Sequence, residues 1–422
     1  MTRAAFATAL LLGALASAQP DTYFVPIAAR TPTPPAVGAT AMQTSLWLPD
    51  PGVDAAQSLL FGTGGGTSVP FLLGTLAPAT LSAFPAQVDA VAAASGVLIG
   101  TQSRTLLAVS SGGSIFFGTV VSGTFTSAGG PASPIPGSSA IALSALPDGG
   151  AALLVLDASK MIDRWDLDLS SGIVTATRGF SGSGAPTGGG SFDEPNTLYF
   201  DGLRNIGFVG GRVLGDVYRF DPNLDAGAPT VFDAALMSGG RLAPPVSGLA
   251  VYQASDAGYL LAANGHGLTV YDLSKSNPAL GGFRVIPQDT IGPITSPAGV
   301  AVTNLPAGTA LPKGVVAVGD QTQTDLALMR WDVLAGQVDG GLVIDTTDPR
   351  GGGDGGSTVD AGVDGGGGGG GGGGGTSGGG GPLSPGIPVD HSSSCASTSG
   401  GPALAALLAV LALLAPRRRQ RR

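Results

Sequence analysis

A recurring pattern of short β-rich runs is the feature that most limits what this chain can fold into. The clearest copies lie in Val246–Asp332, where each half contains such runs separated by turns with Gly, Asn or Pro. Each copy ends in an aromatic residue followed by a charge, Tyr271-Asp272 and then Trp331-Asp332, and similar endings occur earlier at Trp165-Asp166 and Tyr218-Arg219. The four aromatic residues are about 53 to 60 residues apart, a spacing typical of one four-stranded blade with its loops.

This period predicts a closed ring of sheets. The part of the chain rich in β-runs is long enough for roughly six such blades. A blade exposes apolar surface on both faces and is stable only when neighbouring blades cover it. We therefore predict an all-β fold, a six-bladed β-propeller over residues 41–345, in which Leu326–Val333 forms the closing strand of the last copy. An all-β sandwich or a pair of barrels is the alternative.

The first residues predict export. Residues 1–18 contain a basic start at Arg3, an apolar run and an Ala16-Ser17-Ala18 pattern, which together are typical of a secretory signal peptide cleaved after Ala18. Residues 19–40 are rich in Pro and Ala. We expect this segment to wrap the outside of the ring or to be mobile.

The composition changes sharply after the predicted propeller. Residues 346–390 are dominated by Gly and are predicted to be a disordered tether, because such a segment cannot bury apolar surface. Residues 391–422 contain Cys395, a short apolar helix at Ala403–Ala415 and a final arginine cluster. That helix would span about 20 Å, short of the roughly 30 Å hydrocarbon core of a membrane.

This tail resembles the MYXO-CTERM type of sorting signal, in which a cysteine precedes the apolar helix. The resemblance implies cleavage near Cys395 by a myxosortase-type protease and a lipid on that cysteine. An ordinary transmembrane helix that anchors the chain is the alternative. Both readings place the propeller outside the inner membrane, and we predict an exported protein tethered through its tail to the cell surface or outer membrane.

Charge and residue content exclude several classes of function. The formal net charge is −9, which argues against nucleic acid as a partner because phosphate neutralisation by Lys and Arg supplies most of that affinity. The single cysteine rules out an intramolecular disulfide. The only histidines are His266 and His391, so an HExxH metalloprotease motif is absent. His266 is expected to lie in a turn.

Short motifs in the repeat region resemble those of one enzyme family. In the later copies they are Gly258–Ala263, Val270-Tyr271, Gly299–Val302, Leu311–Val315, Asp320 and the closing Leu-Met-Arg-Trp. Upstream, Val97–Arg104 is similar to a strand that ends in an active-site arginine in that family, and Gln87–Asp89 is similar to its Asn-Val-Asp motif. Over about Ala41–Asp332 the chain resembles the beta-propeller phytases. The resemblance implies a secreted, calcium-dependent phosphatase.

The resemblance also implies site residues. In these enzymes carboxylates hold Ca²⁺ ions over the channel, and Lys and Arg bind the substrate phosphates. By resemblance, Arg104 and Lys160 are the candidate catalytic residues, and the candidate calcium ligands are Asp320, Asp89, Asp193 and Glu194. Other carboxylates of the family are missing, among them the acidic pair that aligns with Gln43–Trp47. An ion pair for Arg104 and a turn role for Asp320 are the alternatives.

Two functions are compatible with these observations. The first is a surface-displayed, phytase-like phosphatase that uses calcium to hydrolyse a phosphate monoester of a small molecule. The second is a non-catalytic surface propeller that binds a ligand or a protein partner.

Overall fold

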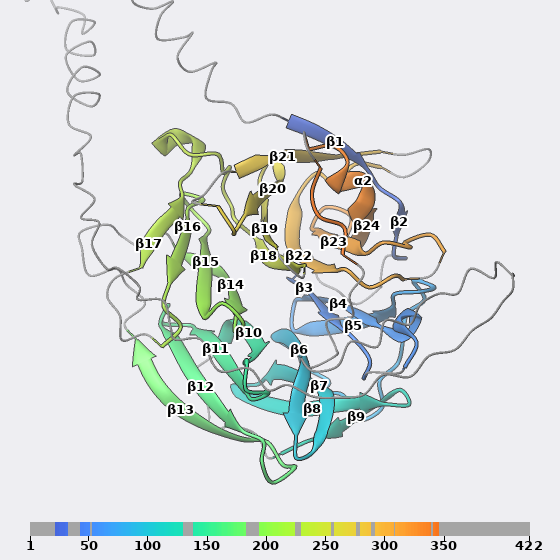
Figure 1. Ribbon diagram of the computed structural model, residues 1–422, viewed down its shortest axis with the longest axis vertical. Helices are drawn as coiled ribbons and strands as arrows, with labels where there is room; N and C mark the ends of the chain where they lie inside the picture. Colours follow the sequence, from blue (N-terminus) through green and yellow to red (C-terminus); the bar gives the residue numbers. More distant parts are fainter. Residues whose placement is uncertain are drawn as a thin grey trace, which may run out of the picture. The chain divides into compact units, whose positions relative to one another are not determined.

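The computed structural model describes the residues that form the repeats. These are residues 22–32, 43–50, 53–129, 138–182, 194–223, 229–254, 257–275, 279–287, 292–307, 309–338 and 341–345. All of them belong to one compact unit, which spans Met1–Gly356. They form six β-sheets arranged as the blades of a β-propeller, which confirms the predicted fold (Figure 1).

Each of the first three blades is an antiparallel meander. The first blade contains β3 (Gln43–Trp47), β4 (Leu59–Gly64) and β5 (Thr67–Leu72), with the 3-10 helix η1 (Ala55–Gln57) before β4. The second contains β6 (Ala90–Ile99), β7 (Gln102–Ser111), β8 (Ser114–Val121) and β9 (Thr124–Ser127). The third contains β10 (Ser138–Ala145), β11 (Ala151–Asp157), β12 (Ile162–Asp168) and β13 (Thr175–Gly182).

The other three blades repeat this order. The fourth contains β14 (Pro195–Asp201), β15 (Ile206–Gly211), β16 (Val217–Phe220) and β17 (Thr230–Asp233), followed by the 3-10 helix η2 (Leu236–Ser238). The fifth contains β18 (Gly248–Gln253), β19 (Gly258–Asn264), β20 (Gly267–Asp272) and β21 (Ala279–Ile286). The sixth contains β22 (Pro297–Thr303), β23 (Val315–Asp320) and β24 (Asp325–Arg330), and the short helix α2 (Trp331–Ala335) follows it.

The second strand of a blade is its most buried part. Every residue of β11, which reads AALLVLD, is buried, and the same holds for β4, β19 and β23. These strands lie inside their own sheet and between the two neighbouring blades. They are therefore nearly continuous apolar runs rather than the apolar and polar alternation of a sheet with one wet face.

Buried side chains hold the blades together in pairs. Among the described residues, the buried apolar side chains form six clusters, and each cluster joins two adjacent blades. One of them closes the ring, because Leu60 and Phe71 of the first blade pack with Leu326 and Leu328 of the sixth. The innermost strands also contact one another in sequence, and β22 contacts β3. Each blade thus buries both of its faces, as the period predicts.

The segment before the first blade completes the last two. β2 (Ala29–Arg30) pairs antiparallel with β24 and supplies a fourth strand to the sixth blade. β1 (Thr22–Pro26) pairs in parallel with β21 and adds a fifth strand to the fifth blade. Residues 19–40 were expected to wrap the ring or to be mobile. Where it is described, this segment does lie on the outside of the ring, because the aromatic and β-branched sequence of β1, TYFVP, favours an outer strand.

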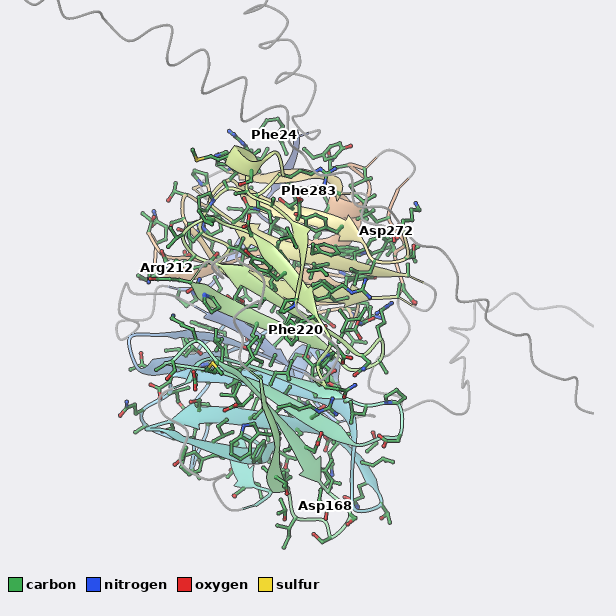
Figure 2. All side chains as sticks on the ribbon, turned by 90° about the vertical axis from the view of Figure 1, so that its left-hand side faces the viewer. Phe24, Asp168, Arg212, Phe220, Asp272 and Phe283 are labelled. Atoms are coloured by element: carbon green, nitrogen blue, oxygen red, sulfur yellow. The ribbon has the colours of Figure 1, made fainter. Side chains whose placement is uncertain are left out.

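The alternation of side chains along β1 matches this outer position. Phe24 is 53% exposed, whereas Phe283 on the neighbouring β21 is 1% exposed. Figure 2 shows Phe24 at the edge of the molecule and Phe283 within it. The ring of Tyr23, which is next to Phe24 in β1, lies 5.2 Å from the ring of Phe283. β1 therefore covers the edge of the fifth blade with one face and meets solvent with the other.

The four aromatic residues that define the period occupy equivalent places. Trp165, Tyr218 and Tyr271 lie in β12, β16 and β20, the third strands of their blades. Trp331 follows the third strand of the sixth blade, but it begins helix α2. The prediction of a strand through Val333 was therefore wrong at its end. Trp331 is fully buried and stacks on Tyr252 of the fifth blade, with ring centroids 3.9 Å apart, and this contact outweighs the strand preference of the local sequence.

Candidate functional site

A cavity of about 810 Å³ runs along the inner strands of the blades. Residues of β3, β6, β10, β14, β18 and β22 line it, so every blade contributes its first strand to the wall. The same six strands surround the centre of the ring in Figure 1. The cavity is therefore the central channel of the propeller, and its size is within the range of small-molecule binding sites.

Small and uncharged side chains make up most of the channel wall. The inner strands read AVAAASGVLI in β6, SSAIALSA in β10, GLAVYQ in β18 and PAGVAVT in β22. Of the described residues that line the cavity, none is Lys, Arg or His, and the ionisable carboxyls are those of Asp148, Asp201 and Asp345. The wall is thus nearly neutral, and its few charges are negative.

Hydroxyl groups of the wall link neighbouring blades. The Ser45 hydroxyl of the first blade donates to the Val91 carbonyl oxygen of the second at 2.5 Å. The Ser247 hydroxyl donates to the Pro297 carbonyl oxygen at 2.7 Å, which joins the fifth and sixth blades. Such bonds give these hydroxyls partners that they would otherwise need from water. The polar side chains of the wall therefore contribute to assembly of the ring.

The three carboxyls lie at one end of the channel. Asp201 ends β14, and Asp148 follows β10 in the turn to β11. The Asp201 carboxylate accepts from Arg204 at 2.8 Å and from Gln253 at 3.2 Å, while the Asp148 carboxylate accepts from the Gly150 backbone N–H at 2.9 Å. Burial raises the pKa of the nearby Tyr199 hydroxyl, and the negative charge of Asp201 raises it further.

The last described residues pass this end of the channel. The Asp345 backbone N–H donates to the Tyr252 hydroxyl at 2.9 Å, and that hydroxyl donates to the Asp345 carbonyl oxygen at 2.9 Å. The Val343 carbonyl oxygen accepts from the Trp331 indole at 3.0 Å, and the Val343 N–H donates to the Tyr259 hydroxyl at 3.1 Å. Tyr252, Tyr259 and Trp331 thus hold residues 343–345 against the fifth and sixth blades.

Arg104, the first candidate phosphate contact, is paired with an acid. It lies on β7, and its guanidinium donates to the Asp50 carboxylate at 2.5 Å and to the Gln102 side chain at 2.5 Å. The second Asp50 oxygen accepts from the Thr105 backbone N–H at 2.9 Å. Arg104 is 35% exposed and Asp50 is 17% exposed, so the pair lies at the surface. This is the ion pair that the residues allowed as an alternative; contact with phosphate stays a prediction.

Lys160 and Glu194 belong to the third and fourth blades, whereas Arg104 belongs to the second. Lys160 occupies the turn between β11 and β12, and its ammonium donates to the Pro195 carbonyl oxygen at 3.4 Å. Glu194 is exposed just before β14, where its backbone carbonyl accepts from Arg212 at 2.8 Å. Asp193 lies outside the described residues.

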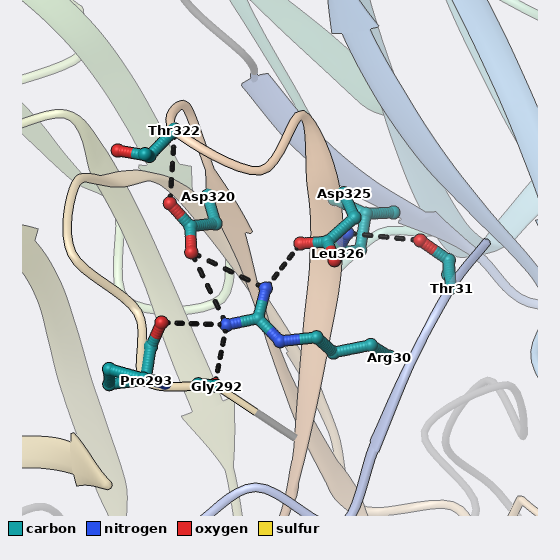
Figure 3. Close-up of polar contacts among 8 residues, drawn as sticks. All are labelled: Arg30, Thr31, Gly292, Pro293, Asp320, Thr322, Asp325 and Leu326. Atoms are coloured by element: carbon teal, nitrogen blue, oxygen red, sulfur yellow. Dashed lines mark hydrogen bonds and ion pairs between the residues drawn. The ribbon is translucent and has the colours of Figure 1, made fainter. Parts of the chain in front are cut away.

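Asp89 and Asp320 support local structure on different blades. The Asp89 carboxylate accepts from the Gly112 backbone N–H at 3.2 Å, in the turn between β7 and β8. The Asp320 side chain is completely buried and accepts from Arg30 at 3.3 Å and from the Thr322 backbone N–H at 3.1 Å (Figure 3). Within the described ranges no three His, Cys, Asp or Glu side chains are close enough to form a metal site. The six to eight oxygen ligands of Ca²⁺ would have to come largely from elsewhere.

Arg30 is a part-buried side chain at the centre of a polar cluster that sequence reasoning missed. Its guanidinium donates to the Gly292 and Pro293 carbonyl oxygens, both at 2.9 Å, and also pairs with Asp325 next to Asp320 (Figure 3). Burial raises the pKa of the Asp325 carboxyl, and Arg30 opposes this effect. A lone Arg in a Pro-rich segment carries no pattern that reveals partners 290 residues away.

The predicted processing sites are outside the structure. Ala18, Cys395, the Gly-rich tether and the apolar tail do not fall within the described residues. Those that are described include no helix long and apolar enough to cross a membrane. His266 does lie in a turn as expected, with its backbone N–H bonded to the Asn264 side chain at 3.0 Å.

Comparisons with known proteins do not assign this chain to a family. No family model and no curated protein matches the chain. Solved structures with some likeness include BBS1N in complex with ARL6DN (11% identity, 68% of this chain and 77% of that one, TM-score 0.40). Others are Kuenenia stuttgartiensis hydrazine synthase (12%, 72% and 80%, TM-score 0.40) and SapL1 lectin in complex with alpha methyl fucoside (13%, 69% and 93%, TM-score 0.42). At these scores no property of those proteins is transferred to this chain.

Proposed function

We propose that this chain is a non-catalytic β-propeller that binds a ligand in its central channel. The observation that carries the proposal is the near-neutral wall, in which the described lining residues include no Lys, Arg or His. A phosphate monoester carries about two negative charges near pH 7. Enzymes that hydrolyse such esters place cations or metal ions where that charge lies. The described part of the channel wall offers a phosphate ester no compensating cation.

The positions of the candidate site residues favour the same conclusion. Arg104 is paired with Asp50, and Asp320 is buried against Arg30. The Asp89 carboxylate accepts from a backbone N–H of the second blade, and the Lys160 ammonium donates to the Pro195 carbonyl beside Glu194 on the fourth. The phytase-like phosphatase implied by the sequence motifs is the rival function, and it requires these side chains to act on one phosphate.

Phosphate release decides between the two functions. The full chain is incubated with phytate or p-nitrophenyl phosphate, with calcium or with a chelator, and calcium binding is measured by calorimetry. We expect no calcium-dependent turnover above a heat-denatured control and no saturable calcium heat. Turnover that depends on calcium and is lost in the Arg104→Met variant would overturn the proposal.

Ligand binding is tested by thermal denaturation. A ligand that binds only the folded state raises the melting temperature according to its concentration and affinity. Small molecules of three classes, uncharged, anionic and cationic, are added at increasing concentration. We expect at least one class to give a saturable rise that the channel variant Ala93→Phe reduces. A series in which no class shifts the melting temperature argues against channel binding.

We further propose that the propeller is exported and displayed through its C-terminal tail. The support is the signal-like pattern that ends at Ala18 and the cysteine, apolar and arginine segments after residue 390. Mass spectrometry of the mature protein is expected to find Gln19 at the start and a new end near Cys395. A mature chain that retains Met1 and Arg422 would contradict the proposal.

A further inference from the structure

We infer that the channel takes an uncharged, largely apolar small molecule. This inference rests on the proposed ligand-binding role and narrows it to one chemical class. It draws on the volume of the channel, the side chains that reach it, the hydrogen bonds that its hydroxyls already make and the charges at its end.

The channel is large enough for an organic molecule of drug size. Its volume of about 810 Å³ is within the roughly 300 to 1,000 Å³ of typical small-molecule pockets. Leu46, Ala93 and Val302 line it from three different blades and are each only partly buried by protein. An apolar ligand that covered these side chains would remove further apolar surface from water, which stabilises the complex by about 25 cal/mol for each Å².

Several hydroxyls of the wall already donate their protons within the protein, whereas the buried Ser103 hydroxyl has no hydrogen-bond partner. Ser45 and Ser247 donate to carbonyl oxygens of neighbouring blades. The Ser144 hydroxyl donates to the Ala145 carbonyl oxygen at 3.2 Å and accepts from the Gly202 N–H at 2.8 Å. An anion that lost its water here could take a hydrogen bond from Ser103 but would meet no Lys, Arg or His among the described lining residues, and an uncompensated buried charge is costly. An uncharged ligand avoids this cost.

The carboxyl groups at one end of the channel also favour an uncharged ligand over an anion. Asp148, Asp201 and Asp345 line that end, and of these Asp201 is paired with Arg204. These carboxyls disfavour an anion through repulsion. A cation would be attracted to this end only, because the described wall beyond it holds no carboxyl group. The uncharged class is therefore the one that the whole length of the channel accepts.

A pair of related fluorophores tests this selectivity. N-phenyl-1-naphthylamine is uncharged, and 8-anilino-1-naphthalenesulfonate has the same aromatic rings with a sulfonate. Each is titrated into the full chain. We expect saturable binding of the uncharged probe and at least about tenfold weaker binding of the sulfonate, a difference of about 1.4 kcal/mol.

Variants locate the binding site. Ala93→Phe and Val302→Phe fill the channel from the second and sixth blades and are each expected to weaken the uncharged probe about tenfold. Val231→Phe on the outer strand β17 adds the same ring outside the channel and should leave binding unchanged. Met237→Ser removes the most exposed apolar side chain, at 98% exposure, and should also leave binding unchanged. Circular dichroism and the melting temperature show that each variant is folded.

The outcomes separate this inference from the proposed function. Equal or tighter binding of the sulfonate would overturn the inference, and so would loss of binding in Met237→Ser but not in the channel variants. No binding of either probe would overturn it as well. In each case a saturable thermal shift by an anionic or cationic molecule, reduced by Ala93→Phe, would leave the proposed ligand-binding role intact.

Discussion

The channel wall and the closing seam of the ring are built from opposite kinds of residue. The seam consists of β1 and β2 with the parts of the fifth and sixth blades that they contact. It contains the buried Arg30 with Asp320 and Asp325, and the stack of Trp331 on Tyr252. The wall contains mainly Ala, Gly, Val, Ser and Leu. The seam thus holds a charged cluster and an aromatic stack, whereas the described wall consists mainly of small, uncharged side chains.

This contrast bears on Asp320, the predicted calcium ligand at the end of β23. Asp320 follows the Val-Val-Ala-Val-Gly run of β23, where the resemblance places a calcium ligand. In the structure it accepts from Arg30, which belongs to β2 at the other end of the repeat region. An acidic residue at a strand end can serve a metal or a structural ion pair, and the partner that reaches it decides which. In the structure the partner at Asp320 is Arg30, and calcium binding by Asp320 stays a prediction.

Removal of the seam arginine is expected to have the largest effect. Arg30→Met leaves Asp320 and Asp325 buried without their cation, a change that costs about 3–5 kcal/mol when a buried pair is broken. Chemical denaturation of the variant and the wild type measures the loss. Arg30→Lys keeps the charge but not the two-pronged geometry, and it should fall between them. A loss below about 1 kcal/mol for Arg30→Met would show that the seam does not depend on this ion pair.

Added bulk should distinguish the hollow wall from the packed blades. Ala262→Phe inserts a ring into β19, where Ala262 has no exposed surface, and is expected to cost about 1–3 kcal/mol or more through overpacking. Ala93→Phe points the same ring toward the channel and should cost clearly less. The two variants are compared by denaturant midpoint. Equal losses would indicate that the channel has no room for a ligand.

High pH should lower the stability of the fold, because the buried hydroxyl of Tyr252 in the seam resists ionisation. Burial, the main cause, raises the pKa of Tyr252 to about 12, above the usual value of about 10. Below pH 10 the hydroxyl is protonated in both states, so its contribution is constant. Between about 10 and 12 the unfolded chain loses the proton first, and stability falls as pH rises. Melting temperatures from pH 9 to 12 measure this decline.

A tyrosine variant provides the control for that decline. Burial also raises the pKa values of Tyr199 and Tyr271, so wild-type stability should drop with contributions from all three. Tyr252→Phe removes one of them and should make the decline shallower. At neutral pH it also loses the hydrogen bonds to Asp345, each of which contributes about 0.5–1.5 kcal/mol. If stability fell equally steeply with pH in Tyr252→Phe and the wild type, the raised pKa of Tyr252 would be contradicted.

The surface ion pair should matter least. Arg104→Met breaks the pair with Asp50 but leaves the Asp50 bond to the Thr105 N–H in place. Pairs exposed to this degree contribute about 0–1 kcal/mol, because solvent screens them. Denaturation at low and high salt should show a small effect that decreases with salt. A loss of unfolding free energy as large as that of Arg30→Met would show that the surface ion pair stabilises the fold as much as the seam ion pair does.

Much of the fold follows from the sequence. The spacing of Trp165, Tyr218, Tyr271 and Trp331 predicted the repeat, and the structure places the first three on equivalent strands. The apolar run Ala151–Asp157 forms a fully buried second strand in the structure. The candidate site residues were less predictable, because the motifs carry no information about which side chains are already paired. Arg104 with Asp50 is one example.

By itself the sequence determined the blade as a unit, since strand period, turn residues and apolar content act over short distances along the chain. Only the tertiary structure decided how the ring closes and what its channel contains. Arg30 meets Asp320 across 290 residues, and six separate inner strands together make one nearly neutral wall. Such contacts form between residues far apart in the chain, so their chemistry depends on closure of the ring rather than on any local pattern.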